Sequence, residues 1–134
     1  MAKILIVEDD PNVAGFLSTI LRGAGYLCAS ASTGAQARQL LDADPDIGLL
    51  LLDHNLGDAS DTGLNFLQAL RQSPSHQRLP VIVCSGDSRG TVVSGFLGQK
   101  VSDFIKKPFR PERLLGDVQR VLGAPGTPVA APSA

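Results

Sequence analysis

The sequence predicts an α/β domain built on a five-stranded parallel sheet with helices on both faces. Short apolar runs, which suit strands buried on both sides, alternate with stretches whose apolar residues recur every three to four positions, as in amphipathic helices. Proline, glycine and acidic residues separate the two kinds of stretch. At 134 residues, the chain has the length of one domain with a single core.

The four leucines at residues 49–52, which lead straight into Asp53, are the clearest strand signal. A short continuous apolar run fits a strand covered on both faces, although periodicity alone does not separate it from a piece of buried helix. Its length and Gly48 before it favour the strand. Similar runs predict strands at 3–7, 26–31, 80–84 and 103–105.

Helical patterns fill the intervals between these strands. Pro11 suits the first turn of a helix over residues 11–24, with Asp10 as its candidate N-cap. Thr33 can cap a second helix, which ends before Pro45.

Three further helices are predicted, at residues 64–70, 89–98 and 111–122. The segment 89–98 is the weakest of them, because its three glycines each oppose a helix by up to ~1 kcal/mol relative to alanine. We therefore expect one domain over residues 1–122. Residues 123–134 are rich in alanine and proline, which predicts a disordered tail or a linker stub.

Strands that alternate with helices require crossover connections. Right-handed crossovers with one reversal of strand order give a flavodoxin-like, doubly wound (βα)5 fold with strand order 2-1-3-4-5. In this topology the carboxyl ends of the first, third, fourth and fifth strands lie together. The residues expected at that edge are Asp9, Asp10, Asp53, Ser85 and Lys107.

Three carboxylates, a hydroxyl and an ammonium group at one sheet edge predict magnesium-dependent phosphoryl transfer. Close carboxylates repel one another, and Mg²⁺ removes that repulsion while keeping places for water and a phosphate oxygen. An aspartate such as Asp53 can attack a phosphoryl group and form an aspartyl-phosphate. Lys107 and the Ser85 hydroxyl would then contact the transferred group.

Composition narrows the class of protein. The net charge of −1 argues against a basic nucleic-acid face, so we expect no direct nucleic-acid partner. No apolar run approaches the ~20 residues of a membrane span, and no signal peptide is evident, so we expect no membrane association. Cys28 and Cys84 lie in apolar stretches without CxxC spacing, which favours buried free thiols over a disulfide or metal pair. These features predict a cytoplasmic protein.

Each candidate residue also has a purely structural interpretation. An aspartate before a proline usually only caps a helix, which would account for Asp10. Ser85 before a glycine suits a simple turn, and most lysines are solvated surface charges. His54 and His76 are expected to be exposed. Asp53 is the hardest to explain in this way, because the leucines before it bury its surroundings.

Together, these residues resemble the response-regulator receiver domains of two-component signalling, over residues 3–122. The matching segments are the acidic pair within residues 7–10, Asp53 after its apolar strand, Ser85 after residues 80–84, and Lys107-Pro108-Phe109 after residues 103–105. Each segment is a weak signal alone, but four in this order and spacing form a specific pattern.

The resemblance implies that Asp53 accepts a phosphoryl group from a sensor histidine kinase or a histidine phosphotransfer protein. The domain would catalyse its own phosphorylation and dephosphorylation rather than act as a conventional turnover enzyme, and it would signal to an effector protein or downstream domain. The implied Mg²⁺ ligands are Asp10, Asp53 and the backbone carbonyl of Asn55, with Asp9 acting through water.

The resemblance also implies the parts of a switch. Ser85 and Lys107 would contact the phosphoryl group, and Phe104 would fill the space that Ser85 leaves. The Lys107–Pro108 bond is expected to be cis, which a bond before proline permits at modest cost.

Two segments depart from the family's pattern. Gly57 stands where a proline is usual and Gly63 lies two positions late, which predicts a longer and more flexible loop after Asp53. Lys100-Val101 replaces the common Gly-Ala before the fifth strand. The first departure bears on phosphoryl lifetime and kinase docking, and the second on the surface that faces the effector.

Two other functions stay open. A Mg²⁺-dependent phosphohydrolase with Asp53 as nucleophile would need a second acid/base carboxylate and a substrate pocket or cap, for which the sequence has no large insertion. A receiver-like interaction module would bind a partner without being phosphorylated. The complete set of candidate residues argues against that module, whereas the unusual loop favours it.

Overall fold

A computed structural model describes residues 3–53, 55–58, 61–85, 101–107 and 109–123. Its elements are β1 (Lys3–Val7), α1 (Pro11–Gly23), β2 (Leu27–Ala31), α2 (Gly34–Ala43), β3 (Ile47–Asp53), β4 (Asn55–Asp58), β5 (Asp61–Thr62), α3 (Gly63–Arg71), the short 3-10 helix η1 (Pro74–His76), β6 (Val81–Ser85), β7 (Asp103–Lys106) and α5 (Pro111–Leu122). The helix expected over 89–98, and all but the first residue of the expected tail, lie outside the described residues.

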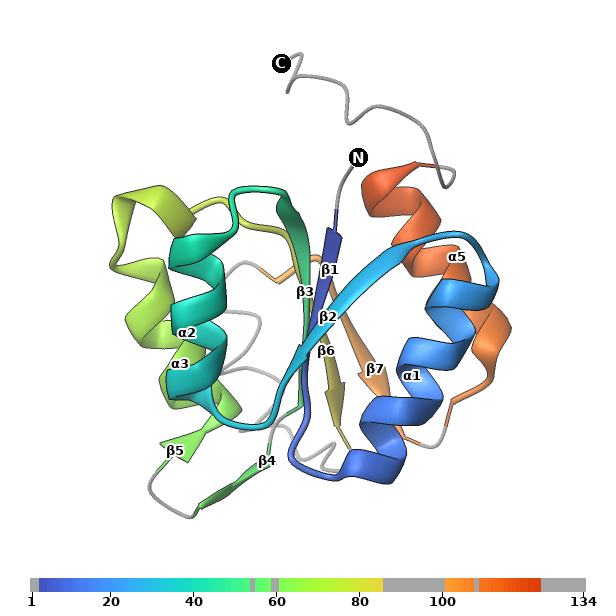
Figure 1. Cartoon of the computed structure of the whole chain (residues 1–134), viewed down its shortest axis with the longest axis horizontal. Helices are drawn as coiled ribbons and strands as arrows, with labels where there is room; N and C mark the ends of the chain where they lie inside the picture. The colour runs from blue at the N-terminus through green and yellow to red at the C-terminus, as the bar shows by residue number, and fades with distance from the viewer. Residues whose placement is uncertain (1–2, 54, 59–60, 86–100, 108, 124–134) are drawn as a thin grey trace.

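The main sheet has five parallel strands in the order β2-β1-β3-β6-β7. Counted along the chain without the two short strands β4 and β5, this is the predicted order 2-1-3-4-5, so the doubly wound fold is confirmed. The central strand, β3, pairs with β1 on one side and β6 on the other. Because all five strands run in the same direction, their carboxyl ends meet at one edge of the sheet (Figure 1).

Helices cover both faces of the sheet, with α1 and α5 on one side and α2 and α3 on the other (Figure 1). Side chains alternate between the faces along β3, which divides its leucines between the two layers. Leu50 and Leu52 belong to the core cluster that contains Leu67 of α3, whereas Leu49 and Leu51 belong to the cluster on the opposite face. A strand covered on both sides therefore needs apolar residues at every position, as the continuous run predicted.

Capping side chains begin two of the helices as the sequence predicts. The Asp10 Oδ1 accepts a hydrogen bond from the Asn12 N–H at 2.9 Å, and Pro11 follows as the first helical residue of α1. The Thr33 Oγ1 accepts from the Gln36 N–H at 3.1 Å at the start of α2. These bonds satisfy backbone donors that a helix itself leaves without a partner.

The segment after Asp53 differs from the flexible loop that the sequence predicts. β4 and β5 pair as an antiparallel hairpin, with Asn55 opposite Thr62 and Asp58 opposite Asp61. β5 leads directly into α3 at Gly63. Its polar composition concealed it, because strand prediction depends on apolar alternation and on turn pairs such as Asn-Gly, which this segment lacks.

The cysteine prediction is confirmed and one histidine prediction is wrong. Cys28 and Cys84 are both free and buried. His76, which the sequence predicted to be exposed, lies at the end of η1 and is only 9% exposed. His54 lies outside the described residues. In the described part of the chain, no helix is long and apolar enough to cross a membrane.

Candidate functional site

The carboxyl edge of the sheet brings together residues that are far apart in the sequence. In the register of β1 and β3, Val7 lies opposite Leu52, so the residues that follow them, Glu8 and Asp53, are neighbours. Asp53 in turn lies opposite Cys84 of β6. β7 completes the edge, and Lys107 follows its last residue.

The Lys107 ammonium group joins two carboxylates that come from different strands. Its Nζ donates to Oε2 of Glu8 at 3.1 Å and to Oδ1 of Asp53 at 3.2 Å. Glu8 is 4% exposed and Asp53 is 7% exposed, so these charges interact where little water can screen them. Two buried carboxylates and one cation leave a local excess of negative charge.

Burial and this excess of negative charge together shift the pKa values of the site. Burial raises the pKa of Glu8 to about 7, repulsion from Asp53 adds to the effect, and Lys107 opposes it. Burial lowers the pKa of Lys107, but attraction to Asp53 and Glu8 outweighs it, so that pKa is raised and the side chain stays charged. Burial also raises the pKa of the neighbouring Cys84 thiol to about 12, which keeps Cys84 from acting as a nucleophile.

A carboxylate oxygen from each of Glu8, Asp9 and Asp53 lies within 4.8 Å of the other two. Glu8 and Asp53 are buried and Asp9 is exposed, so the group has a buried floor and a side open to solvent. Oxygen ligands with room for water and a phosphate oxygen suit Mg²⁺. A cation at this position would also favour the ionised form of Glu8, so the residues present fit the metal that the sequence predicts.

The side chain of Asp10 lies outside this group of three carboxylates, although its backbone N–H donates to Oε1 of Glu8 at 3.4 Å. Pro11 begins α1, which leaves Asp10 as the N-cap with its Oδ1 directed to the Asn12 N–H. The two acids that lie close to Asp53 are therefore Glu8 and Asp9, whereas the sequence predicted Asp9 and Asp10. Sequence reasoning missed Glu8, although its position directly after the apolar run of β1 matches that of Asp53 after the leucines of β3.

The remaining predicted residues lie on the strands β4, β6 and β7. Ser85 is the last residue of β6, opposite Lys106 of β7, and Asn55 begins β4. Phe104 is half-buried on β7 and packs against the core cluster that contains Leu50. Pro108 lies outside the described residues, and the predicted cis bond with it.

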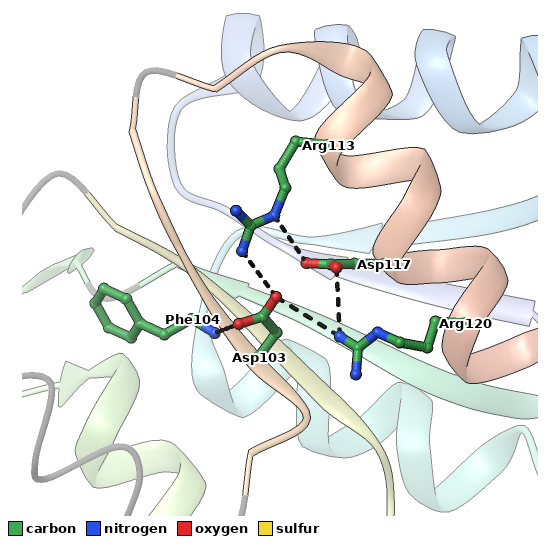
Figure 2. Close-up of polar contacts among 5 residues, drawn as sticks. All are labelled: Asp103, Phe104, Arg113, Asp117 and Arg120. Carbon is green, nitrogen blue, oxygen red and sulfur yellow. Dashed lines mark hydrogen bonds and ion pairs between the residues drawn. The ribbon is translucent and has the colours of Figure 1, made fainter.

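A ring of four charged side chains holds the start of β7 against α5 (Figure 2). Arg113 contacts Asp103 at 2.9 Å and Asp117 at 3.4 Å. Arg120 contacts the same two acids, Asp103 at 3.6 Å and Asp117 at 3.3 Å. Asp103 also accepts a hydrogen bond from the backbone N–H of Phe104. The ring thereby fixes the short strand from which Lys107 continues.

Comparisons with known proteins match the chain to one family. The chain matches the family model of the response regulator receiver domain over residues 4–119. It is 36% identical over 124 residues to the transcriptional regulatory protein CpxR of Escherichia coli, covering 91% of this chain and 50% of CpxR. It is 29% identical over 121 residues to the two-component response regulator PprB of Pseudomonas aeruginosa, covering 89% of this chain and 43% of PprB. The chain thus spans about half the length of these relatives.

Solved structures share the fold. The chemotaxis protein CheY4 of Vibrio cholerae superimposes with a TM-score of 0.82 at 27% identity, covering 91% of this chain and 99% of CheY4. A response regulator receiver protein from Pseudomonas putida gives a TM-score of 0.83 at 27% identity, covering 89% of this chain and 96% of that one. Each superposition spans nearly the whole of the solved protein.

The raised pKa of Glu8 predicts that the metal-free protein loses stability as the pH rises. Below about pH 4.5 the carboxyl is protonated in both the folded and the unfolded state, so it does not change the free energy of unfolding. Between about pH 4.5 and about 7 the carboxyl ionises in the unfolded state but stays protonated in the folded state, so stability falls as the pH rises. The cost at higher pH is up to about 3 kcal/mol, at about 1.4 kcal/mol per pKa unit. Glu8→Gln should remove this cost.

Urea unfolding without metal checks this prediction. The Glu8→Gln variant should be more stable than the wild type at about pH 8, and the advantage should shrink toward about pH 5. If the two proteins keep the same difference in unfolding free energy at both pH values, the carboxyl of Glu8 does not titrate as described.

Proposed function

Because the chain belongs to the response regulator receiver domain family, we propose that it is a phosphorylation switch in which Asp53 is the phosphoacceptor. The observation that supports this most is the contact of Asp53 with Lys107 beside the acids Glu8 and Asp9. A nucleophilic carboxylate, a fixed cation and an acidic metal-binding group are the parts that phosphoryl transfer to an aspartate requires.

Glu8, Asp9 and Asp53 would hold Mg²⁺, which supplies positive charge beside the oxygens of the transferred phosphoryl group. This assignment replaces Asp10 with Glu8, since Asp10 caps α1. The backbone carbonyl of Asn55 stays a proposed ligand, as the resemblance implies.

The donor would be phosphohistidine on a sensor histidine kinase or a histidine phosphotransfer protein. An oxygen of the Asp53 carboxylate forms a bond to phosphorus while the bond between phosphorus and the imidazole nitrogen breaks, and the imidazole leaves with the electron pair. Lys107, already held between two acids, keeps positive charge next to the reacting oxygen. The same groups would favour dephosphorylation, in which a water oxygen forms a bond to phosphorus, the bond between phosphorus and the Asp53 oxygen breaks, and inorganic phosphate leaves.

Ser85 and Phe104 would convert phosphorylation into a change of surface. Ser85 ends the strand next to β3, so a phosphoryl group on Asp53 is within reach of that strand's end. Phe104 lies on β7, the strand next to β6, and is half-buried. Its ring would move into the space that Ser85 leaves when Ser85 moves toward the phosphoryl group. A local change of charge would bias this two-state element, and the effector protein or downstream domain would read the result.

Asp53→Asn should abolish phosphorylation. Incubated with Mg²⁺ and phosphoramidate, the wild-type protein should gain one phosphate by intact mass, and the Asn variant none, because an amide is not a nucleophile toward phosphorus. Asp42→Asn, the same change on α2, should be labelled as the wild type. Equal labelling of the Asp53 variant would rule out Asp53 as the acceptor; rapid multiple turnover by the wild type would indicate a phosphohydrolase instead.

A matched pair of substitutions separates the two acidic residues before α1. Asp9→Asn removes a proposed ligand and should lower the Mg²⁺ affinity at least about tenfold, which corresponds to about 1.4 kcal/mol. Asp10→Asn keeps a good N-cap and should leave the affinity within about twofold, since asparagine and aspartate cap helices equally well. The rate of phosphorylation as a function of Mg²⁺ concentration measures both. A larger effect at Asp10 would restore the ligand set that the sequence predicted.

A further inference from the structure

A hydrogen bond joins the ends of α1 and α5 across 97 positions of the sequence. Tyr26, which directly precedes β2, donates from its hydroxyl to the carbonyl oxygen of Gly123 at 2.9 Å. Gly123 is the C-cap residue of α5. The two helices lie side by side on one face of the sheet (Figure 1). Because α1 starts at the edge that carries Asp53, the bond lies at the opposite end of the domain.

The backbone of Tyr26 is fixed by the way in which α1 ends. Gly25 has a φ of +98°, a conformation that glycine adopts without strain. The Gly25 N–H donates to the carbonyl of Arg22 at 3.0 Å, and the Tyr26 N–H donates to that of Leu21 at 3.0 Å. These are the two bonds of a Schellman motif. The ring of Tyr26 is 6% exposed and belongs to the same core cluster as Leu21, so the hydroxyl is held in one place.

The hydroxyl of Tyr26 has a use beyond packing. A phenylalanine ring would fill the same part of the core, and a buried hydroxyl costs free energy unless it has a hydrogen-bond partner. Burial raises the pKa of Tyr26, so the hydroxyl keeps its proton and acts as a donor at neutral pH. The partner that it finds is the first carbonyl group beyond α5.

Gly123 is thereby held on both of its backbone polar groups. Its N–H donates to the carbonyl of Gln119 at 2.8 Å, within α5, and its carbonyl accepts from Tyr26. Its φ of +80° is a conformation that residues with a side chain rarely adopt. A Cβ at this position would meet no atom within 4 Å, so the backbone conformation alone favours glycine here.

We propose that Tyr26 fixes the point and the direction in which the chain leaves the domain. The carbonyl of Gly123 belongs to the planar peptide group that follows α5, so a bond to it orients that group. Whatever follows α5 is therefore attached to the end of α1 as well as to α5, and its connection is a fixed one rather than a free hinge. This role does not depend on whether Asp53 accepts a phosphoryl group.

Tyr26→Phe keeps the buried ring and removes only the donor. In NMR of the ¹⁵N-labelled full chain, hydrogen exchange of the residue 123 amide should become about fivefold faster, as expected for the loss of one hydrogen bond. Its ¹H–¹⁵N NOE should also fall, because the end of α5 becomes more mobile on the ps–ns timescale. A role confined to overall stability would speed exchange of the core amides of β3 but leave this NOE unchanged.

Gly123→Ala tests the same bond from its other end. Alanine is strained at a φ of +80°, so the carbonyl should leave its position and exchange of the residue 123 amide should again become faster. Combined with Tyr26→Phe it should add little, because both substitutions remove one interaction. Gly116→Ala is the matched control, since a Cβ within α5 also meets no atom within 4 Å there. It should leave exchange at residue 123 within about twofold.

Unchanged exchange and NOE at residue 123 in Tyr26→Phe would overturn the proposal, as would effects of Tyr26→Phe and Gly123→Ala that simply add. The rate of phosphorylation by phosphoramidate should stay within about twofold in Tyr26→Phe. A large loss of that rate would show that Tyr26 acts on the phosphoryl site, contrary to the proposal.

Discussion

The interaction on which the site depends is the contact of one ammonium group with two buried carboxylates. Glu8 and Asp53 lie side by side because β1 and β3 are neighbouring parallel strands, and their charges would repel without a cation between them. Lys107 meets this need in the metal-free protein. Positive charge from a bound divalent cation would take over part of this role and leave Lys107 able to contact a phosphoryl group. Burial and repulsion from Asp53 raise the pKa of Glu8 despite the opposing effect of Lys107.

The fold supplies the rigidity that this arrangement requires. The leucines of β3 pack into both layers of the core, which fixes Asp53 at the end of the central strand. Lys107 leaves an edge strand of only four residues, β7, and an edge strand has a neighbour on one side only. The charged ring between Asp103 and α5 compensates for this by tying the start of β7 to a helix. Both partners of the central contact are therefore held from outside the site.

Sequence periodicity was sufficient for the sheet and for every predicted helix in the described part of the chain, because two-sided burial and amphipathic faces leave strong patterns. It also predicted Asp53 and Lys107 at one edge, since topology brings strand ends together. It predicted Asp9 and Asp10 as the acidic pair, whereas the structure groups Glu8 and Asp9 with Asp53 and uses Asp10 as a helix cap, a role that sequence alone cannot weigh against metal binding. The hairpin after Asp53 is polar and lacks a turn pair such as Asn-Gly, and the burial of His76 depends on tertiary packing, so neither leaves a periodic signal.

The most direct test of this account is the titration of the Glu8 carboxyl carbon, followed by ¹³C NMR with and without Mg²⁺. Without metal, the resonance should titrate with a midpoint near the pKa of about 7 that burial and Asp53 impose. With saturating Mg²⁺, the midpoint should fall by at least about one unit, because a bound cation favours the carboxylate. A midpoint that Mg²⁺ leaves unchanged would contradict the assignment of Glu8 to the metal site and the balance of charges described for Lys107.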